Sequence, residues 1–123
     1  MDRLQTRVNS SDAAFKSNHE HNSTLLATLR ERLDGVQEGG GGKYVEKHRS
    51  RGKALPRERI SAICDPGAPF LELSPLAAYD LYDGKAASAG MITGIGVVHG
   101  KECLFVANDA TVKGGSYYPI TVK

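Results

Sequence analysis

The stretch that decides the fold is Gly90-Met91-Ile92-Thr93-Gly94-Ile95-Gly96-Val97-Val98-His99-Gly100-Lys101-Glu102-Cys103-Leu104-Phe105-Val106-Ala107. Runs of β-branched and apolar residues flank the pair His99-Gly100, and a two-residue connection containing glycine is typical of a β-hairpin. We therefore predict strands over 90–98 and 101–107. Gly94 and Gly96 would allow a bulge or a close approach of the backbone. They do not form a dinucleotide-binding turn, because a strand rather than a helix follows them.

The segment after the hairpin joins a cation to glycines. Asn108 and Asp109 stand at the end of the second strand, where we expect them to cap the strand and hold the following loop. Lys113-Gly114-Gly115-Ser116 comes next. Glycines let backbone N–H groups approach an anion, and the lysine supplies a point charge. We predict a phosphate-bearing ligand here, and since the sequence stops at Lys123 we expect most of the site to lie outside it.

A helix is predicted before the hairpin from leucines at helical spacing, which include Leu25, Leu29 and Leu33. Ser23 or Thr24 would cap its start, Gly35, followed by the glycines 39–42, would end it, and its leucine face needs a partner on this chain or another. The polar residues 1–20 show no period and predict a disordered or loosely attached arm. The glycines 39–42 predict a flexible break.

Shorter elements follow the glycines. We predict a basic helix over 43–51 and a second helix that begins at Pro56 and ends at Asp65-Pro66-Gly67. Alternation predicts a short strand over 70–73. A hairpin with one edge helix is marginal alone, so this order of helices and then strands favours the opening part of a larger α/β domain.

Charge is concentrated in one block. Between Lys43 and Ile60 there are seven Lys or Arg and two Glu, a local charge of +5, so the rest of the chain sums to −3 of the net +2. The block is either a solvated face or subunit contact, or an anion site. If Arg51-Gly52-Lys53 faces the same groove as 113–116, both loops would hold a nucleotide-like diphosphate. Few aromatics interleave with the block, which argues against single-stranded nucleic acid.

The composition limits the class of protein further. With 40% hydrophobic and 24% charged residues, the chain is typical of soluble globular proteins, without a secretion signal or a run long enough to span a bilayer. Cys64 and Cys103 are predicted to be buried free thiols, which fits a reducing compartment. The four histidines show no metal-ligand spacing, and no Gly-x-Ser-x-Gly nucleophile motif occurs.

Longer motifs follow one another over roughly residues 24–123. In chain order they are Gly40-Gly41-Gly42-Lys43, Ser50-Arg51-Gly52-Lys53-Ala54-Leu55-Pro56-Arg57-Glu58-Arg59-Ile60, Asp65-Pro66-Gly67-Ala68-Pro69-Phe70-Leu71-Glu72-Leu73-Ser74, Ile92-Thr93-Gly94-Ile95-Gly96 and Ala107 to Lys123. In these motifs and their order the sequence is similar to the N-terminal part of the biotin-dependent acyl-CoA carboxyltransferase subunits. Leu55-Pro56 and the ending Val112 to Pro119 resemble most the branch of methylcrotonoyl-CoA carboxylase β subunits.

The resemblance implies a crotonase-like α/β fold of stacked ββα units. Residues 23–123 would be an incomplete N-terminal carboxyltransferase domain, with N-terminal helices followed by a β-hairpin, behind a flexible arm over 1–22. It implies an enzyme of the ligase class, part of an ATP-dependent holoenzyme, when the subunit is full-length. That subunit would transfer a carboxyl group from carboxybiotin to the γ-carbon of 3-methylcrotonoyl-CoA in leucine degradation. The chain alone is expected to be inactive.

The resemblance also implies partners and a place in the cell. Biotin would be carried by a partner α subunit, and the β subunits would form a homo-oligomer. No nucleic acid, membrane or metal is expected. The location would be the cytoplasm of a bacterium or the mitochondrial matrix, and not outside the cell. No side-chain nucleophile is required, because backbone N–H groups would stabilise the thioester enolate. We therefore assign no catalytic residue in this chain.

Binding residues are implied position by position. Lys113, Gly114, Gly115 and Ser116 would lie near the adenine and phosphates of CoA, with Arg51 and Lys53 as further contacts. The family's Ser-Gly-Gly-Ala oxyanion turn does not occur in this sequence. The acyl group is open between methylcrotonoyl and relatives such as geranoyl. The alternative is a non-catalytic module that binds an anion or docks a subunit through the basic block.

Overall fold

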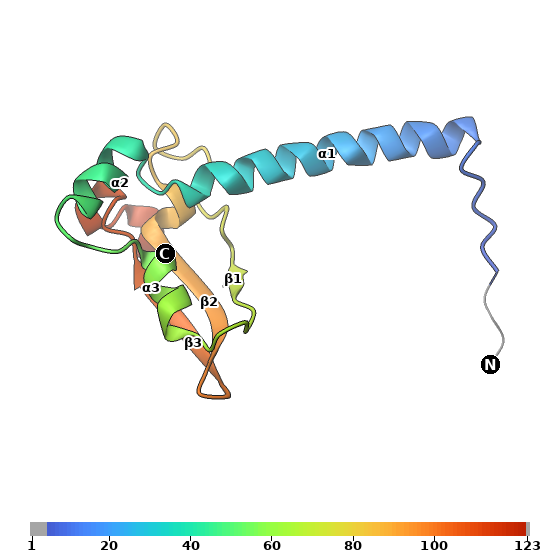
Figure 1. Cartoon of the computed structure of the whole chain (residues 1–123). Helices are drawn as coiled ribbons and strands as arrows, with labels where there is room; N and C mark the ends of the chain where they lie inside the picture. Colours follow the sequence, from blue (N-terminus) through green and yellow to red (C-terminus); the bar gives the residue numbers. More distant parts are fainter. Residues whose placement is uncertain (1–4, 123) are drawn as a thin grey trace. The chain divides into compact units, whose positions relative to one another are not determined.

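The computed structural model describes residues 5–122 (Figure 1). The chain divides into two compact units, and the boundary between Arg32 and Leu33 falls inside helix α1. In chain order the elements are α1 (Ala13–Gln37), α2 (Gly42–Arg49), α3 (Pro56–Ile63), β1 (Leu71–Leu73), η1 (Ala87–Gly90), β2 (Met91–Val98), β3 (Lys101–Asn108), η2 (Lys113–Gly115) and η3 (Pro119–Val122).

The first unit consists mainly of helix α1, which begins well before the predicted start. The carboxylate of Asp12 accepts a hydrogen bond from the N–H of Ala14 at 3.1 Å and caps the helix. The predicted start at Ser23 or Thr24 is therefore wrong. Residues 13–22 contain helix-forming residues and no Gly or Pro, so the helix extends there without an apolar stripe. Residues 1–4 of the expected arm lie outside the described residues.

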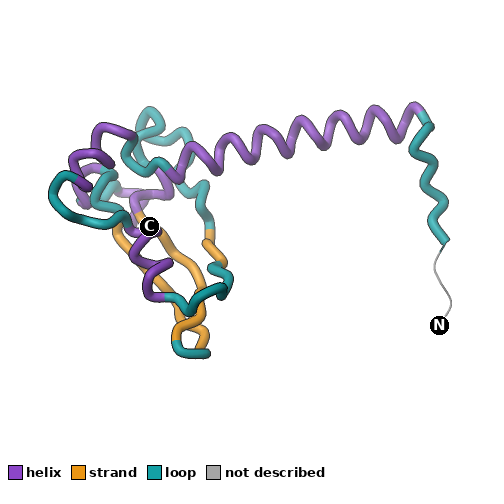
Figure 2. The backbone as a smooth tube through the Cα atoms, in the orientation of Figure 1, coloured by secondary structure: helices purple, strands orange, loops and turns teal. Residues whose placement is uncertain are grey.

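The second unit is built on a three-stranded antiparallel sheet with the order β1-β2-β3. The predicted hairpin is confirmed: β2 and β3 pair from Met91↔Asn108 to Val98↔Lys101 without a bulge. Figure 2 shows the two strands running to their turn. His99 and Gly100 have φ values of 49° and 73°, the left-handed conformation that a tight hairpin turn needs. Asp65 fixes the turn, because its carboxylate accepts both of their backbone N–H groups at 2.7 Å.

The glycines of β2 allow side chains to pack on the sheet. A Cβ at Gly94 would lie 2.3 Å from Cζ of Phe70, and a Cβ at Gly96 would lie 2.7 Å from Sγ of Cys64. Phe70 in turn meets Phe105 edge to face, with ring centroids 5.8 Å apart. The predicted close approach is thus confirmed. The cysteines are free but half-buried, so their predicted burial is wrong: Cys64 ends α3 at the edge of this contact.

The other sheet face carries aliphatic side chains that are exposed in the part of the chain that the structure describes. The strand register places Leu71 opposite Ile95 and Ile95 opposite Leu104. The exposed fractions are 60% for Leu71 and 70% for Leu104. Among the described residues the buried apolar core is small and consists of Val36, Ile60, Ala86, Ile92 and Val112. An apolar face of this kind marks an interaction surface or a layer of a larger domain.

Candidate functional site

The candidate site is a cavity of about 520 Å³ in the second unit. Residues from distant parts of the sequence meet there: the end of α1, the glycine turn, α2, the loop before η1, and the segment after β3. The lining residues are Gly35, Glu38, Gly39, Gly40, Gly41, Tyr44, Gly84, Lys85, Thr111, Lys113, Gly114 and Tyr118.

The glycine turn forms a fixed wall of this cavity. The N–H of Gly40 donates to Oγ1 of Thr111 at 2.9 Å, and Thr111 donates from that hydroxyl to the carboxylate of Asp109 at 2.6 Å. A Cβ at Gly40 would lie 1.9 Å from the carbonyl oxygen of Thr111. The prediction of a flexible break at residues 39–42 is therefore wrong at its first half, because Gly39 and Gly40 pack closely on Thr111 and Asp109, whereas a Cβ at Gly41 or Gly42 would meet nothing within 4 Å. Asp109 and Thr111 are 4% and 2% exposed.

The strand end behaves as predicted. The side-chain amide of Asn108 donates to the carbonyl oxygen of Gly115 at 2.7 Å, and Asp109 accepts the backbone N–H of Thr111 at 2.8 Å. The residues after β3 are thereby tied to the sheet. This confirms that Asn108 and Asp109 cap the strand and hold the following loop.

Lys113 stands in a strained turn with its side chain held in place. Lys113, Gly114 and Gly115 have φ values of 48°, 67° and 85°, and the left-handed conformation costs free energy at a non-glycine residue. The ammonium group of Lys113 donates to the carbonyl oxygen of Tyr117 at 3.0 Å and lies 4.3 Å from the ring centroid of Tyr118. Ser116 donates from its hydroxyl to the carbonyl oxygen of Lys113 at 2.7 Å.

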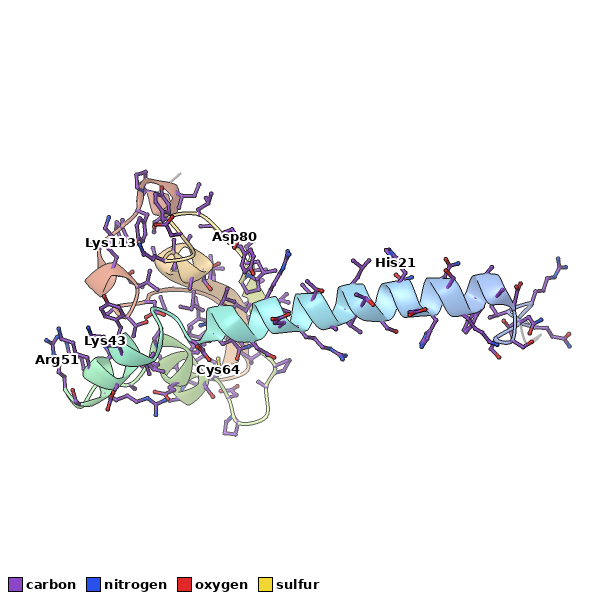
Figure 3. The ribbon with its side chains drawn as sticks, turned by 90° about the horizontal axis from the view of Figure 1, so that it is seen from above. His21, Lys43, Arg51, Cys64, Asp80 and Lys113 are labelled. Atoms are coloured by element: carbon purple, nitrogen blue, oxygen red, sulfur yellow. The ribbon has the colours of Figure 1, made fainter. Side chains whose placement is uncertain are left out.

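The two loops singled out in the sequence do meet. Gly114 and Arg51 line a second cavity of about 140 Å³, together with Tyr44, Lys47, His48 and Ala110. Figure 3 shows the labelled Arg51 and Lys113 carried by segments of the same region. Lys53, Gly115 and Ser116 line neither of these two cavities.

One lysine of the larger cavity was missed in the sequence. Lys85 lines the cavity from the loop before η1, and its ammonium group lies 3.2 Å from the carboxylate of Asp83 in an exposed ion pair. The tripeptide Asp83-Gly84-Lys85 is another place where a glycine adjoins a cation, so the same signal would have found it. The lining carries two cations, Lys85 and Lys113, and one carboxylate, Glu38, which leaves one net positive charge, and Asp83 offsets part of the Lys85 charge from outside the lining. Such a cavity suits an anionic group such as a phosphate.

Among the described residues, no three His, Cys, Asp or Glu side chains are grouped so as to hold a metal ion. Of the described helices, none combines the length and apolar character that crossing a bilayer requires.

The family description "carboxyl transferase domain" matches residues 47–123. This chain belongs to the carboxyltransferase domain family. The matched residues include the loop that carries Arg51, the turn over 113–116 and the whole sheet. A solved carboxyltransferase relative, the β subunit of geranyl-CoA carboxylase from P. aeruginosa, superposes with a TM-score of 0.82 at 37% identity, over 97% of this chain and 22% of that one. The predicted α/β crotonase-like fold is confirmed.

Curated carboxyltransferase relatives are more similar in sequence. The probable methylcrotonoyl-CoA carboxylase beta chain of Drosophila melanogaster is 53% identical over 98% of this chain and 21% of its own length. The methylcrotonoyl-CoA carboxylase beta chain of Arabidopsis thaliana is 52% identical over 98% of this chain and 20% of its own length. This carboxyltransferase chain therefore spans about a fifth of the curated relatives that it matches.

Proposed function

We propose that this chain forms part of the carboxyltransferase subunit of a biotin-dependent acyl-CoA carboxylase and binds the phosphates of the acyl-CoA substrate. The observation that supports this most is the larger cavity, where Lys113 and Lys85 face the same space beside the Gly114 turn. CoA carries a diphosphate. Such a group is bound by ammonium groups and by backbone N–H groups that it can approach closely.

Each predicted binding residue has a role in this proposal. Lys113 supplies charge, and Gly114 and Gly115 let the backbone come close to the diphosphate. Ser116 holds the turn through its bond to the Lys113 carbonyl. Arg51 acts from the adjoining cavity. Lys53 contributes at longer range through the positive field of the basic block.

We propose 3-methylcrotonoyl-CoA as the substrate, with the carboxyl group coming from biotin on a partner α subunit. Identities of 52–53% to methylcrotonoyl-CoA carboxylase chains, against 37% to the geranyl-CoA carboxylase chain, favour this acyl group over geranoyl. The full-length subunit would form a homo-oligomer, and the solved transcarboxylase 12S, 31% identical, is described as a hexamer with methylmalonyl-CoA bound. The bacterial cytoplasm or the mitochondrial matrix would be its place.

The residues of this chain would bind and orient the CoA moiety, and the full-length subunit would perform the transfer. We place residues 23–123 in the carboxyltransferase domain and residues 1–22 in an arm before it. Purified chain that carboxylates 3-methylcrotonoyl-CoA from carboxybiotin unaided would contradict this division of labour.

Titration of the chain with CoA, followed by calorimetry, tests the binding site. We expect Lys113→Met to weaken binding about tenfold, the size of one charge-assisted contact. The control is Lys101→Met, which removes the same charge at the hairpin turn. Equal affinity for both variants would contradict a CoA site at the Gly114 turn.

The substrate is tested in a chimera. In it, this chain replaces the matching fifth of the Arabidopsis beta chain. We expect carboxylation of 3-methylcrotonoyl-CoA in the presence of a biotin-carrying partner, with lower kcat/KM for geranoyl-CoA. The reverse preference would contradict the proposed acyl group.

A docking module remains the second candidate, on one observation. Within residues 5–122, Arg49 and Arg57 of the basic block form ion pairs with Glu58 and Glu72, while Lys43 and Arg59 form none. Unpaired cations on a surface suit an acidic partner. CoA binding that survives Lys113→Met and is lost in the double variant Lys43→Gln, Arg59→Gln would favour this candidate.

A further inference from the structure

Helix α1 carries exposed apolar side chains that the proposed function does not use. Leu25, Leu26 and Leu29 are exposed in the first unit, and so is Phe15 earlier on the same helix. Within residues 5–32 no side chain is buried, and α1 is the sole helix or strand there. A helix in a protein gains most of its stability from the packing of one face, so we expect a partner to cover these side chains.

Five of the residues of α1 form a seam that follows a coiled-coil repeat. In heptad positions a to g, Leu26 occupies an a position, and Phe15 and Leu29 occupy d positions. The polar residues His19 and Asn22 fill the a and d positions between them. The rings of Phe15 and His19 stack with centroids 6.1 Å apart, which places both on one face. Polar residues inside an apolar seam fix the register of a partner helix.

The charges of α1 divide between the two sides of the helix. Lys16 and Arg30 both occupy e positions, which flank the seam, whereas Glu20 and Glu31 occupy b and f positions on the far side. Among the described residues, neither Lys16 nor Arg30 forms an ion pair. This flank of the seam is therefore positive and complementary to acidic side chains.

A second copy of α1 does not supply that complement. In a parallel pair Arg30 meets the uncharged Leu25 of the other copy, so no ion pair forms there. In an antiparallel pair with full overlap Lys16 meets Arg30, and Leu26 meets Asn22 instead of a leucine. An anionic membrane fits poorly too, because residues 13–32 carry three cations and two carboxylates, a net charge of only +1.

We propose that the seam of α1 is a docking surface for an amphipathic helix of another protein chain. That helix has apolar residues at its own a and d positions and Asp or Glu at the flanking e and g positions. Contact with Leu26 and Leu29 supplies affinity, and Lys16 and Arg30 select the acidic partner. The seam lies outside both cavities, so this role is separate from CoA binding.

A designed peptide tests the docking surface. The probe is a fluorescein-labelled peptide of three heptads, with Leu at a and d, one Asn to face Asn22, and Glu at e and g. The control peptide has Lys at e and g. Anisotropy titration with the whole chain is expected to show about tenfold tighter binding of the Glu peptide. The double variant Leu26→Gln, Leu29→Gln is expected to lose at least about tenfold of that affinity, while glutamine preserves the helix.

Charge reversal tests the choice of partner. The double variant Lys16→Glu, Arg30→Glu is expected to prefer the Lys peptide. The matched control Glu20→Lys, Glu31→Lys changes two charges on the far side and is expected to keep the preference for the Glu peptide.

Three results would overturn the proposal. One is equal binding of the two peptides, or binding that survives in the leucine variant. Another is a dimer in sedimentation that this variant abolishes, which would assign the seam to a second copy. The third is binding to phosphatidylserine vesicles that the same variant abolishes, which would assign it to a membrane surface.

Discussion

The guanidinium of Arg57 binds the carboxylate of Glu72 through two hydrogen bonds, from Nε to Oε2 at 3.0 Å and from Nη2 to Oε1 at 2.6 Å. Nη2 also donates to the hydroxyl of Ser88 at 3.2 Å, and Ser88 donates in turn to the carbonyl oxygen of Pro75. The side chains of Arg57 and Glu72 are only 23% and 20% exposed. One arginine therefore ties α3 to β1 and to η1, which follows the loop that carries Lys85.

Replacing this arginine is expected to destabilise the chain. Arg57→Met leaves the partly buried carboxylate of Glu72 without its partner and removes one of the two hydrogen bonds of the Ser88 hydroxyl, which costs about 1–3 kcal/mol. The control is Arg49→Met. Arg49 pairs with Glu58 in an exposed geometry, so its loss should cost less than about 1 kcal/mol. Urea unfolding measures both, and equal losses would contradict a structural role for the Arg57–Glu72 pair.

Asp65 gives the hairpin turn a pH dependence. The backbone N–H groups of Gly100 and then His99 hold the pKa of this carboxyl below its ordinary value of 3.8. A depressed folded-state pKa stabilises the fold above the unfolded-state value, and the benefit is lost as the pH falls through the folded-state pKa. We therefore expect Asp65→Asn to be less stable than the natural chain at pH 6. The difference in urea midpoint should shrink below pH 3.8. A difference that does not change with pH would contradict this mechanism.

The sequence predicted the short helices, the strand that follows them and the hairpin, because each is specified locally. The pair His99-Gly100 fixes one turn, and Pro56 fixes one helix start. The start of α1 was not predicted. Asp12 caps the helix, and residues 13–22 have helix propensity but no periodic apolar pattern. The burial of Cys64 and Cys103 depends on which residues pack over them in the folded chain, and no local sequence pattern specifies that.

For the site, the sequence found Lys113 and Arg51 but not the space between them. Which loops share a cavity is a tertiary property, set here by Gly40 packing on Thr111. A run of glycines gives the same local pattern whether it is mobile or closely packed. A glycine next to a cation, the pattern that indicated Lys113, also indicates Lys85. No such pattern indicates Tyr44, because a tyrosine on a basic helix has many roles.

The packing of the glycine turn makes a sharp prediction. A Cβ at Gly40 would lie 1.9 Å from the carbonyl oxygen of Thr111, whereas a Cβ at Gly42 meets nothing within 4 Å. Gly40→Ala is expected to cost about 1–3 kcal/mol by overpacking. Gly42→Ala, at the start of α2, should be neutral or stabilising by up to about 1 kcal/mol. Thermal unfolding of both variants checks this, and a neutral Gly40→Ala would mean that the turn is free to move.

Tyr118, which lines the larger cavity, is expected to affect ligand affinity through its contact with Lys113. Tyr118 stacks on Tyr82 with centroids 4.4 Å apart and holds the ammonium group of Lys113 over its ring. An ammonium group fixed in advance loses less freedom when it binds a phosphate. Since a cation–π contact at an exposed site is worth about 0.5–1 kcal/mol, Tyr118→Leu should weaken CoA binding about two- to fivefold. Tyr118→Phe should restore it, because the ring remains. Tyr117→Leu is the matched control, because the hydrogen bond from Lys113 goes to the backbone carbonyl of Tyr117, which the substitution keeps. Calorimetric titration that found Tyr118→Leu and Tyr117→Leu equal would show that the ring does not position the cation.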